Sequence, residues 1–130
     1  MNYLLLKTKF MNGGEMTEIQ LNNEVILLRQ MVETIVREAA PEVIILFGSR
    51  ARGDTRPDSD VDLLVVESAP FSPQRSRRKE AARLYMALRG LAVSKDILLY
   101  SRDEFDRWKN SPNHVAGRAH REGRVLHGRP

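Results

Sequence analysis

The sequence contains no cysteine. Without thiols the chain can form neither a disulfide nor a thiolate metal site, which excludes a zinc ribbon and a cysteine nucleophile. It also lacks any apolar run near the roughly 20 residues that span a bilayer. The apolar patch Leu4–Leu6 is too short for the core of a secretion signal, and no small-residue cleavage site follows it. We therefore expect a cytoplasmic protein that does not enter a membrane.

Aromatic residues are scarce, and the charge is only modestly positive. Phe, Trp and Tyr make up 6% of the chain, and 21 Lys and Arg stand against 17 Asp and Glu, a net charge of +4. So small an excess fits phosphate-bearing small molecules as well as nucleic acid. The few aromatics are scattered and offer no stacking surface for bases. Nucleic acid is therefore not the expected partner.

The length of 130 residues suits one domain with a single core. Residues 12–14, Asn-Gly-Gly, interrupt any regular element, whereas Thr17 followed by Gln20 has the pattern of a helix-capping box. We therefore expect residues 1–15 to be an N-terminal extension, either disordered or the result of a misassigned start. Residues 16–130 then form the domain. The sequence does not indicate an oligomeric state.

One stretch organises the chain. The apolar run Val43–Phe47 is followed at once by Gly48 and Ser49, and ten residues later by Asp60 and Asp62 at the start of a second apolar run. Alternate strand residues share a face, so the two aspartates project together. Paired carboxylates repel each other unless a cation lies between them, and Mg²⁺ binds one or two carboxylates together with phosphate oxygens. Taken separately, each aspartate could equally be turn chemistry.

The Gly-Ser turn is a candidate phosphate site. Gly48 permits close approach of the backbone to a ligand. Ser49 is a candidate N-cap for a short helix over residues 50–52, whose N–H groups would face an anion. Arg50 and Arg52 either neutralise phosphates through their forked donors or are merely solvated. The predicted nucleotide-binding residues are therefore Gly48, Ser49, Arg50 and Arg52.

This pattern resembles the signature of the DNA polymerase beta-like nucleotidyltransferases, and within them the chain is similar to the minimal nucleotidyltransferase family. The resemblance covers roughly residues 20–127. Its motif is specific to the superfamily and much less specific to any one substrate. It implies an α/β fold with a small mixed sheet and helices mainly on one face.

Apolar spacing and punctuating residues predict the individual elements. The expected helices are 18–40, 74–90, 102–109 and 113–122, and the expected strands are 43–47, 61–66, 93–100 and 124–126. Tyr85 is predicted in the core, and Phe105 and Trp108 are predicted to pack on the sheet. The loop carboxylates Asp54 and Asp58 are expected to be caps or solvated charges. Four basic residues near the start of the second long helix form either a solvated face or a contact for a nucleotide or an acidic partner: Arg75, Arg77, Arg78 and Lys79.

Asp96 begins the third predicted strand, where a charged residue entering an apolar run needs a partner. If this strand lies beside the second, Asp96 can join Asp60 and Asp62. The resemblance implies a third acidic residue on such a strand, which would bind metal or accept the proton of an attacking hydroxyl. A carboxylate in a loop-to-strand turn remains the alternative. The predicted catalytic and metal-binding residues are Asp60, Asp62 and Asp96.

The resemblance also implies a reaction. A hydroxyl would attack the α-phosphorus of ATP in the presence of Mg²⁺, with two ions in the site, and pyrophosphate would leave. Members of the family are often paired with a HEPN-type helical toxin and act as antitoxins by transferring AMP to one of its tyrosines. Two alternatives stay open: transfer to a small hydroxylated molecule such as an aminoglycoside, and a non-catalytic module that masks a partner protein. The chain shows no second domain for tRNA, DNA or an antibiotic, which favours an acceptor delivered by another protein.

Overall fold

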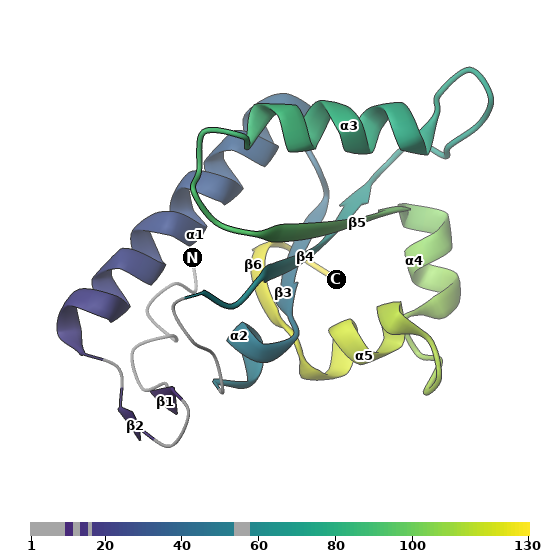
Figure 1. Cartoon of the computed structure of the whole chain (residues 1–130). Helices are drawn as coiled ribbons and strands as arrows, with labels where there is room; N and C mark the ends of the chain where they lie inside the picture. Colours follow the sequence, from purple (N-terminus) through teal and green to yellow (C-terminus); the bar gives the residue numbers. More distant parts are fainter. Residues whose placement is uncertain (1–9, 12–13, 16, 54–57) are drawn as a thin grey trace.

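The centre of the fold is a four-stranded mixed sheet. The computed structural model describes residues 10–11, 14–15, 17–53 and 58–130. The sheet consists of β3 (Val43–Phe47), β4 (Val61–Glu67), β5 (Lys95–Ser101) and β6 (Arg124–Gly128). The strands lie in the order β5-β4-β3-β6, with β4 and β5 parallel and the other two pairs antiparallel (Figure 1). The expected α/β fold with a small mixed sheet is confirmed.

Helices cover both faces of this sheet (Figure 1). One face carries α1 (Glu18–Ala39) and α3 (Arg77–Ala87), and the other carries α4 (Arg102–Trp108) and α5 (Val115–Glu122). Side chains alternate along each strand, so Leu63 and Val65 of β4 enter the first core and Leu64 and Val66 enter the second. The two longest helices thus lie on one face, as predicted, whereas α4 and α5 cover the other face.

The first long helix has the boundaries that its sequence predicts. Thr17 and Gln20 form the expected capping box, in which each backbone N–H donates to the other residue's side chain, at 3.0 and 3.1 Å. The helix ends at Ala39, since Ala40 adopts a left-handed conformation with a φ of 45° directly before Pro41. The predicted helix is confirmed to within one residue.

The second long helix, α3, is shorter than the predicted helix 74–90. It begins after Ser76, whose hydroxyl caps the first turn, and it ends at Ala87. Leu84 is fully buried, but Tyr85 is 36% exposed. The prediction of Tyr85 as a core residue is wrong, because its hydroxyl reaches the outer edge of β5 and makes hydrogen bonds there.

The fourth helix, α4, is capped by Ser101 and shows only part of the predicted packing. Ser101 and Glu104 form a capping box, and Phe105 is fully buried against the sheet. Trp108 is instead 39% exposed and stacks on His114, with ring centroids 4.7 Å apart. Its predicted contact with the sheet is wrong, because the indole covers the start of α5.

A short hairpin precedes α1. β1 (Phe10–Met11) and β2 (Gly14–Glu15) pair antiparallel. Most of the expected extension 1–15 lies outside the described residues, so the boundary at residue 16 stays a prediction. Asp54 also lies outside them. Within the described ranges, no helix combines the length and apolar character that crossing a membrane requires.

Candidate active site

The turn after β3 brings the two halves of the motif into contact. Phe47, the last residue of β3, lies opposite Asp62 in the antiparallel register with β4. Gly48 follows with a φ of 74°, a conformation that residues with a side chain avoid. A Cβ atom at Gly48 would lie 2.2 Å from Oδ2 of Asp62. Glycine is therefore required here by the backbone and by the carboxylate packed against it.

A single helical turn follows, α2 (Ser49–Arg52). Its N-cap is Gly48 rather than Ser49, so the predicted cap is wrong by one residue. The N–H groups of Ala51 and Arg52 donate to the Gly48 carbonyl at 3.1 and 3.2 Å, as expected when Gly48 is the cap. These two groups are already used within the helix, which contradicts the prediction that they face an anion, whereas the same prediction for the N–H of Arg50 stays a prediction.

Three carboxylates lie at one end of the neighbouring strands β4 and β5. Asp62 and Asp96 are paired in the parallel register, as the placement of Asp96 predicts, and Asp60 precedes Asp62 by two residues. Burial raises the pKa of Asp62, and repulsion from Asp96 and Asp60 raises it further, whereas Arg50 and Arg52 lower it. A bound cation would relieve this repulsion.

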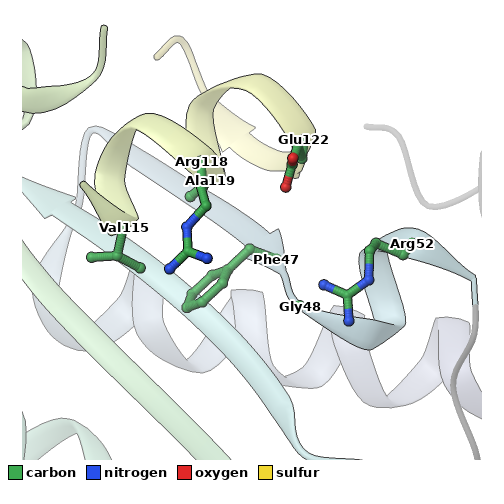
Figure 2. A pocket seen from close by; sticks show the side chains of 7 residues that line it. All are labelled: Phe47, Gly48, Arg52, Val115, Arg118, Ala119 and Glu122. Carbon is green, nitrogen blue, oxygen red and sulfur yellow. The ribbon is translucent and has the colours of Figure 1, made fainter. Parts of the chain in front are cut away.

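A pocket of about 200 Å³ opens beside the Gly48 turn. Its lining comes from β3, the turn, α2 and α5: Phe47, Gly48, Arg52, Val115, Arg118, Ala119 and Glu122. Figure 2 shows the guanidinium groups of Arg52 and Arg118 directed toward the space around Phe47 from opposite sides. Within the part of the chain that the structure describes, the Arg118 guanidinium has no hydrogen-bond or ion-pair partner. Two arginines around so small a pocket favour an anionic ligand such as phosphate.

The sequence matches the nucleotidyltransferase domain family over residues 28–121. The chain belongs to this family. The match includes the Gly48 turn, the three aspartates and most of α5, so the residues that come together in space lie inside the family domain. Among curated proteins, none matches the chain significantly.

Solved structures resemble the chain at low to moderate identity. A protein described as a minimal nucleotidyltransferase shares 31% identity over 75% of this chain and 90% of its own, with a TM-score of 0.50. A nucleotidyltransferase assigned in Sulfolobus solfataricus shares 23% identity over 88% of this chain and 91% of its own, with a TM-score of 0.54. A toxin–antitoxin structure with AMP-PNP shares 22% identity over 77% and 73%, with a TM-score of 0.47.

Nucleotidyltransferases generally use a nucleoside triphosphate and a divalent metal ion. Among the described residues, no three His, Cys, Asp or Glu side chains are arranged to hold a metal ion by themselves. Asp60 and Asp62 nevertheless fit Mg²⁺, which needs only one or two carboxylates when phosphate oxygens and waters complete its coordination. The raised pKa of Asp62 agrees with this, since a nearby cation would favour the ionised form. We therefore expect the metal to bind together with the nucleotide rather than before it.

Arg50 holds the second half of the nucleotidyltransferase motif in place. Its buried guanidinium donates to the carbonyls of Ser59 and Asp60, at 2.6 and 3.3 Å, and pairs with Glu24 of α1 at 3.4 Å. These contacts fasten the chain before β4 to both α1 and α2. They favour a positioning role for Arg50 over the predicted contact with phosphate. Arg52 lines the pocket, and its contact with phosphate stays a prediction.

Tyr85 orients the third carboxylate. Its hydroxyl accepts the N–H of Ile97 at 2.8 Å and donates to Oδ1 of Asp96 at 3.3 Å. The backbone N–H can only donate, so the single phenolic proton is left for the carboxylate. Burial raises the pKa of Tyr85, and the charge of Asp96 adds to the rise, so the phenol stays protonated at neutral pH.

The wall of the pocket on α5 is the part of the site that the sequence reasoning missed. Its four residues follow the spacing i, i+3, i+4, i+7, which marks one face of a helix: Val115, Arg118, Ala119 and Glu122. The sequence contains this helical spacing, but the spacing alone does not predict what this face of α5 contacts. The contact depends on β6, which follows α5 and pairs with β3 beside the Gly48 turn.

Proposed function

We propose that the protein transfers AMP from ATP to a hydroxyl acceptor. One observation carries the proposal: Asp62 lies between the Gly48 turn and Asp96, and burial and two neighbouring aspartates raise its pKa. The carboxylates that we expect to bind a cation thus lie beside the pocket of about 200 Å³, because Gly48 lines that pocket and packs against Asp62. Membership of the nucleotidyltransferase family supports the reaction class.

Each side chain of the site has a role in this reaction. Asp60 and Asp62 would hold Mg²⁺, which when bound neutralises phosphate charge and polarises the phosphoryl oxygens. Arg52 and Arg118 bind phosphate oxygens from two sides of the pocket. Asp96 accepts the proton of the attacking hydroxyl or contributes to a second Mg²⁺ site. The acceptor oxygen forms a bond to the α-phosphorus while the bond to the bridging oxygen breaks, and pyrophosphate leaves.

The acceptor that we propose is a tyrosine hydroxyl of a HEPN-type helical toxin, which the transfer would inactivate. The 31% identity to a protein described as a minimal nucleotidyltransferase supports this choice, since pairing with HEPN proteins is what the resemblance to that family implies. A small hydroxylated molecule and a purely masking role for this chain are the competing possibilities, and the next experiment separates all three.

Intact-mass spectrometry of a HEPN-type partner tests the acceptor. We expect the partner to gain one or more AMP units when incubated with the protein, ATP and Mg²⁺. The doubly substituted variant Asp60→Asn/Asp62→Asn should give no gain. A stable complex of the two proteins without any mass change would instead support masking. Neither a mass change nor a complex would direct the search to small acceptors.

Replacing Arg118 by alanine tests the pocket. We expect the KM for ATP to rise at least about tenfold, because a charge-assisted hydrogen bond to phosphate contributes roughly 1.5–3 kcal/mol. Arg107→Ala is the matched control, since Arg107 is exposed on α4 and does not line the pocket. Steady-state kinetics at varied ATP give the comparison. Equal KM values for the two variants would remove Arg118 from the nucleotide site.

A further inference from the structure

The strand that carries Asp96, β5, lies at the edge of the sheet. Its hydrogen bonds to β4 show which of its backbone groups point outward. Among the described residues β5 pairs only with β4, and the N–H of Val61 donates to the carbonyl of Ser94 at 2.9 Å. In a parallel pair, the N–H and C=O groups of a residue point to the same side. Even-numbered residues of β5 therefore face β4, and Ile97 and Leu99 present their backbone groups to the outside.

Side chains of α3 occupy half of this edge. The hydroxyl of Tyr85 accepts the N–H of Ile97 at 2.8 Å, and Arg77 donates to the carbonyl of Leu99 at 2.7 Å. The carbonyl of Ile97 and the N–H of Leu99 have no hydrogen-bond partner among the described residues. The edge is thus closed at two points and open between them, where one donor and one acceptor are left.

A hollow of about 620 Å³ lies along this open segment, between α3, β5 and α4. It is lined by residues 97–100 of β5, by Arg77, Arg78 and Ala81 of α3, and by Glu104 of α4. Arg77 is neutralised by an ion pair with Glu104 at 2.5 Å. Arg78 is exposed and has no ion-pair partner in the described ranges, so the lining carries one unbalanced positive charge.

We propose that this edge docks an extended, acidic segment of the partner protein as a fifth, parallel strand that delivers the acceptor hydroxyl to Asp96. The proposal rests on the proposed function. In parallel pairing a single residue opposite Leu98 makes both free bonds, donating to Ile97 O and accepting from Leu99 N. An antiparallel segment would need two residues, whose other backbone groups would meet the positions taken by Tyr85 and Arg77.

The direction of the segment fixes its sequence pattern. Strands advance about 3.3 Å per residue, so the residue two places before the docked one lies beside Asp96, with its side chain on the face of Asp62. A tyrosine belongs there. Arg77 contacts Leu99, so the adjacent Arg78 also lies toward the Leu99 end of β5, away from Asp96. Acidic residues should therefore follow the docked residue. The expected pattern is a tyrosine, one spacer, the docked apolar residue, a second spacer and then acidic residues.

The test uses the peptide Tyr-Thr-Val-Thr-Glu-Glu with both termini blocked. A second peptide has lysines in place of the glutamates. N-acetyltyrosinamide serves as an acceptor that is too short to dock. We expect the wild type to transfer AMP to the acidic peptide with at least about tenfold higher kcat/KM than to either other acceptor. Arg78→Glu should lower kcat/KM for the acidic peptide about tenfold and leave the KM for ATP unchanged.

Lys79→Glu is the matched control. It makes the same charge change in the same turn of α3, but Lys79 lines a different hollow, and its variant should behave as wild type. Amide exchange at Leu99, followed by NMR, gives a readout independent of turnover. The Leu99 N–H should be protected by the acidic peptide and unaffected by N-acetyltyrosinamide, whereas the Ile97 N–H should not change.

Two failures can be told apart. If all three acceptors are used equally and Leu99 stays unprotected, the docking proposal is wrong and the proposed function stands. If ATP binds but no acceptor takes AMP, the proposed function fails, and Leu99 protection by the peptide alone then decides whether the edge is a docking site. Equal effects of Arg78→Glu and Lys79→Glu would contradict the charge preference.

Discussion

Asp62→Asn should abolish AMP transfer while making the protein without nucleotide slightly more stable. We expect kcat to fall by at least about 10³-fold, comparable to the loss of a preorganised electrostatic contact in other active sites. Stability should rise because the folded state raises the pKa of Asp62 through burial and through Asp96 and Asp60. A neutral amide removes that cost, which is below about 1 kcal/mol for a partly exposed group. Turnover assays and urea unfolding of the same preparations measure both effects.

Asp58→Asn is the control for this variant. Asp58 is exposed and lies two residues before Asp60, outside the paired carboxylates. It should keep wild-type activity and stability. Loss of activity in both variants would show that the loop, rather than the carboxylate at Asp62, is what the reaction needs. Full activity of Asp62→Asn would remove the proposed mechanism.

Glu67→Gln should stabilise the protein at pH 8 and remove most of its stability change between pH 5 and 8. Glu67 is 4% exposed at the end of β4 and accepts a hydrogen bond from Arg75 at 2.7 Å. Burial, a hydrogen bond with Glu80 and repulsion from Glu80 raise the pKa of Glu67 from 4.5 to about 7. The folded state therefore binds this proton more tightly, and stability falls as pH rises through that window, by on the order of 3 kcal/mol.

Protonation of Glu67 also explains a buried carboxylate oxygen that otherwise lacks a hydrogen-bond partner. Counted as ionised, Glu67 has a buried Oε2 without a donor. Protonation supplies a donor between Glu67 and Glu80, and a glutamine amide can donate in the same place. Glutamine also keeps an oxygen for Arg75, so the variant preserves both contacts without the titration. Parallel pH–stability curves for wild type and variant would contradict this assignment.

Glu104→Gln is a control for which the change of stability at neutral pH should have the opposite sign. A hydrogen bond from Arg77 lowers the pKa of Glu104 to about 2, although burial opposes the shift. A lowered pKa contributes stability that is fully present above about pH 4.5 and is lost as pH falls toward 2. This variant should therefore lose stability at neutral pH and converge on wild type in acid. Urea unfolding across pH 2–8.5 separates the two glutamates.

Local patterns predicted the parts of the site that are close in the chain. Gly48 and Asp62 are tied by spacing and by two flanking strands, and the structure packs one against the other. The position of Asp96 followed from one further step, since a strand–helix–strand unit usually places its strands side by side. Caps at Thr17 and Ser101 were predictable because their partners lie three residues away.

The remaining features depend on contacts that no local pattern contains. Arg50 has the same side chain as Arg52, yet the buried Glu24 of α1 directs it inward. The aromatic ring of Tyr85 fits an apolar stripe, and only the free edge of β5 explains why its hydroxyl leaves the core. Arg118 reaches the pocket because β6 pairs with β3. These are tertiary effects that override local preference.

The pairing of β6 with β3 also sets when the protein can become active during its own synthesis. The Gly48 turn leaves the ribosome before α5 and β6, because β4, α3, β5 and α4 lie between them in the chain. A nascent chain therefore displays its aspartates before it has the pocket wall that carries Arg118. Such distant pairings form late, because a long loop must close first. Chains cut short before β6 would lack the strand pairing that places Arg118 at the pocket, and we expect them to be inert toward ATP.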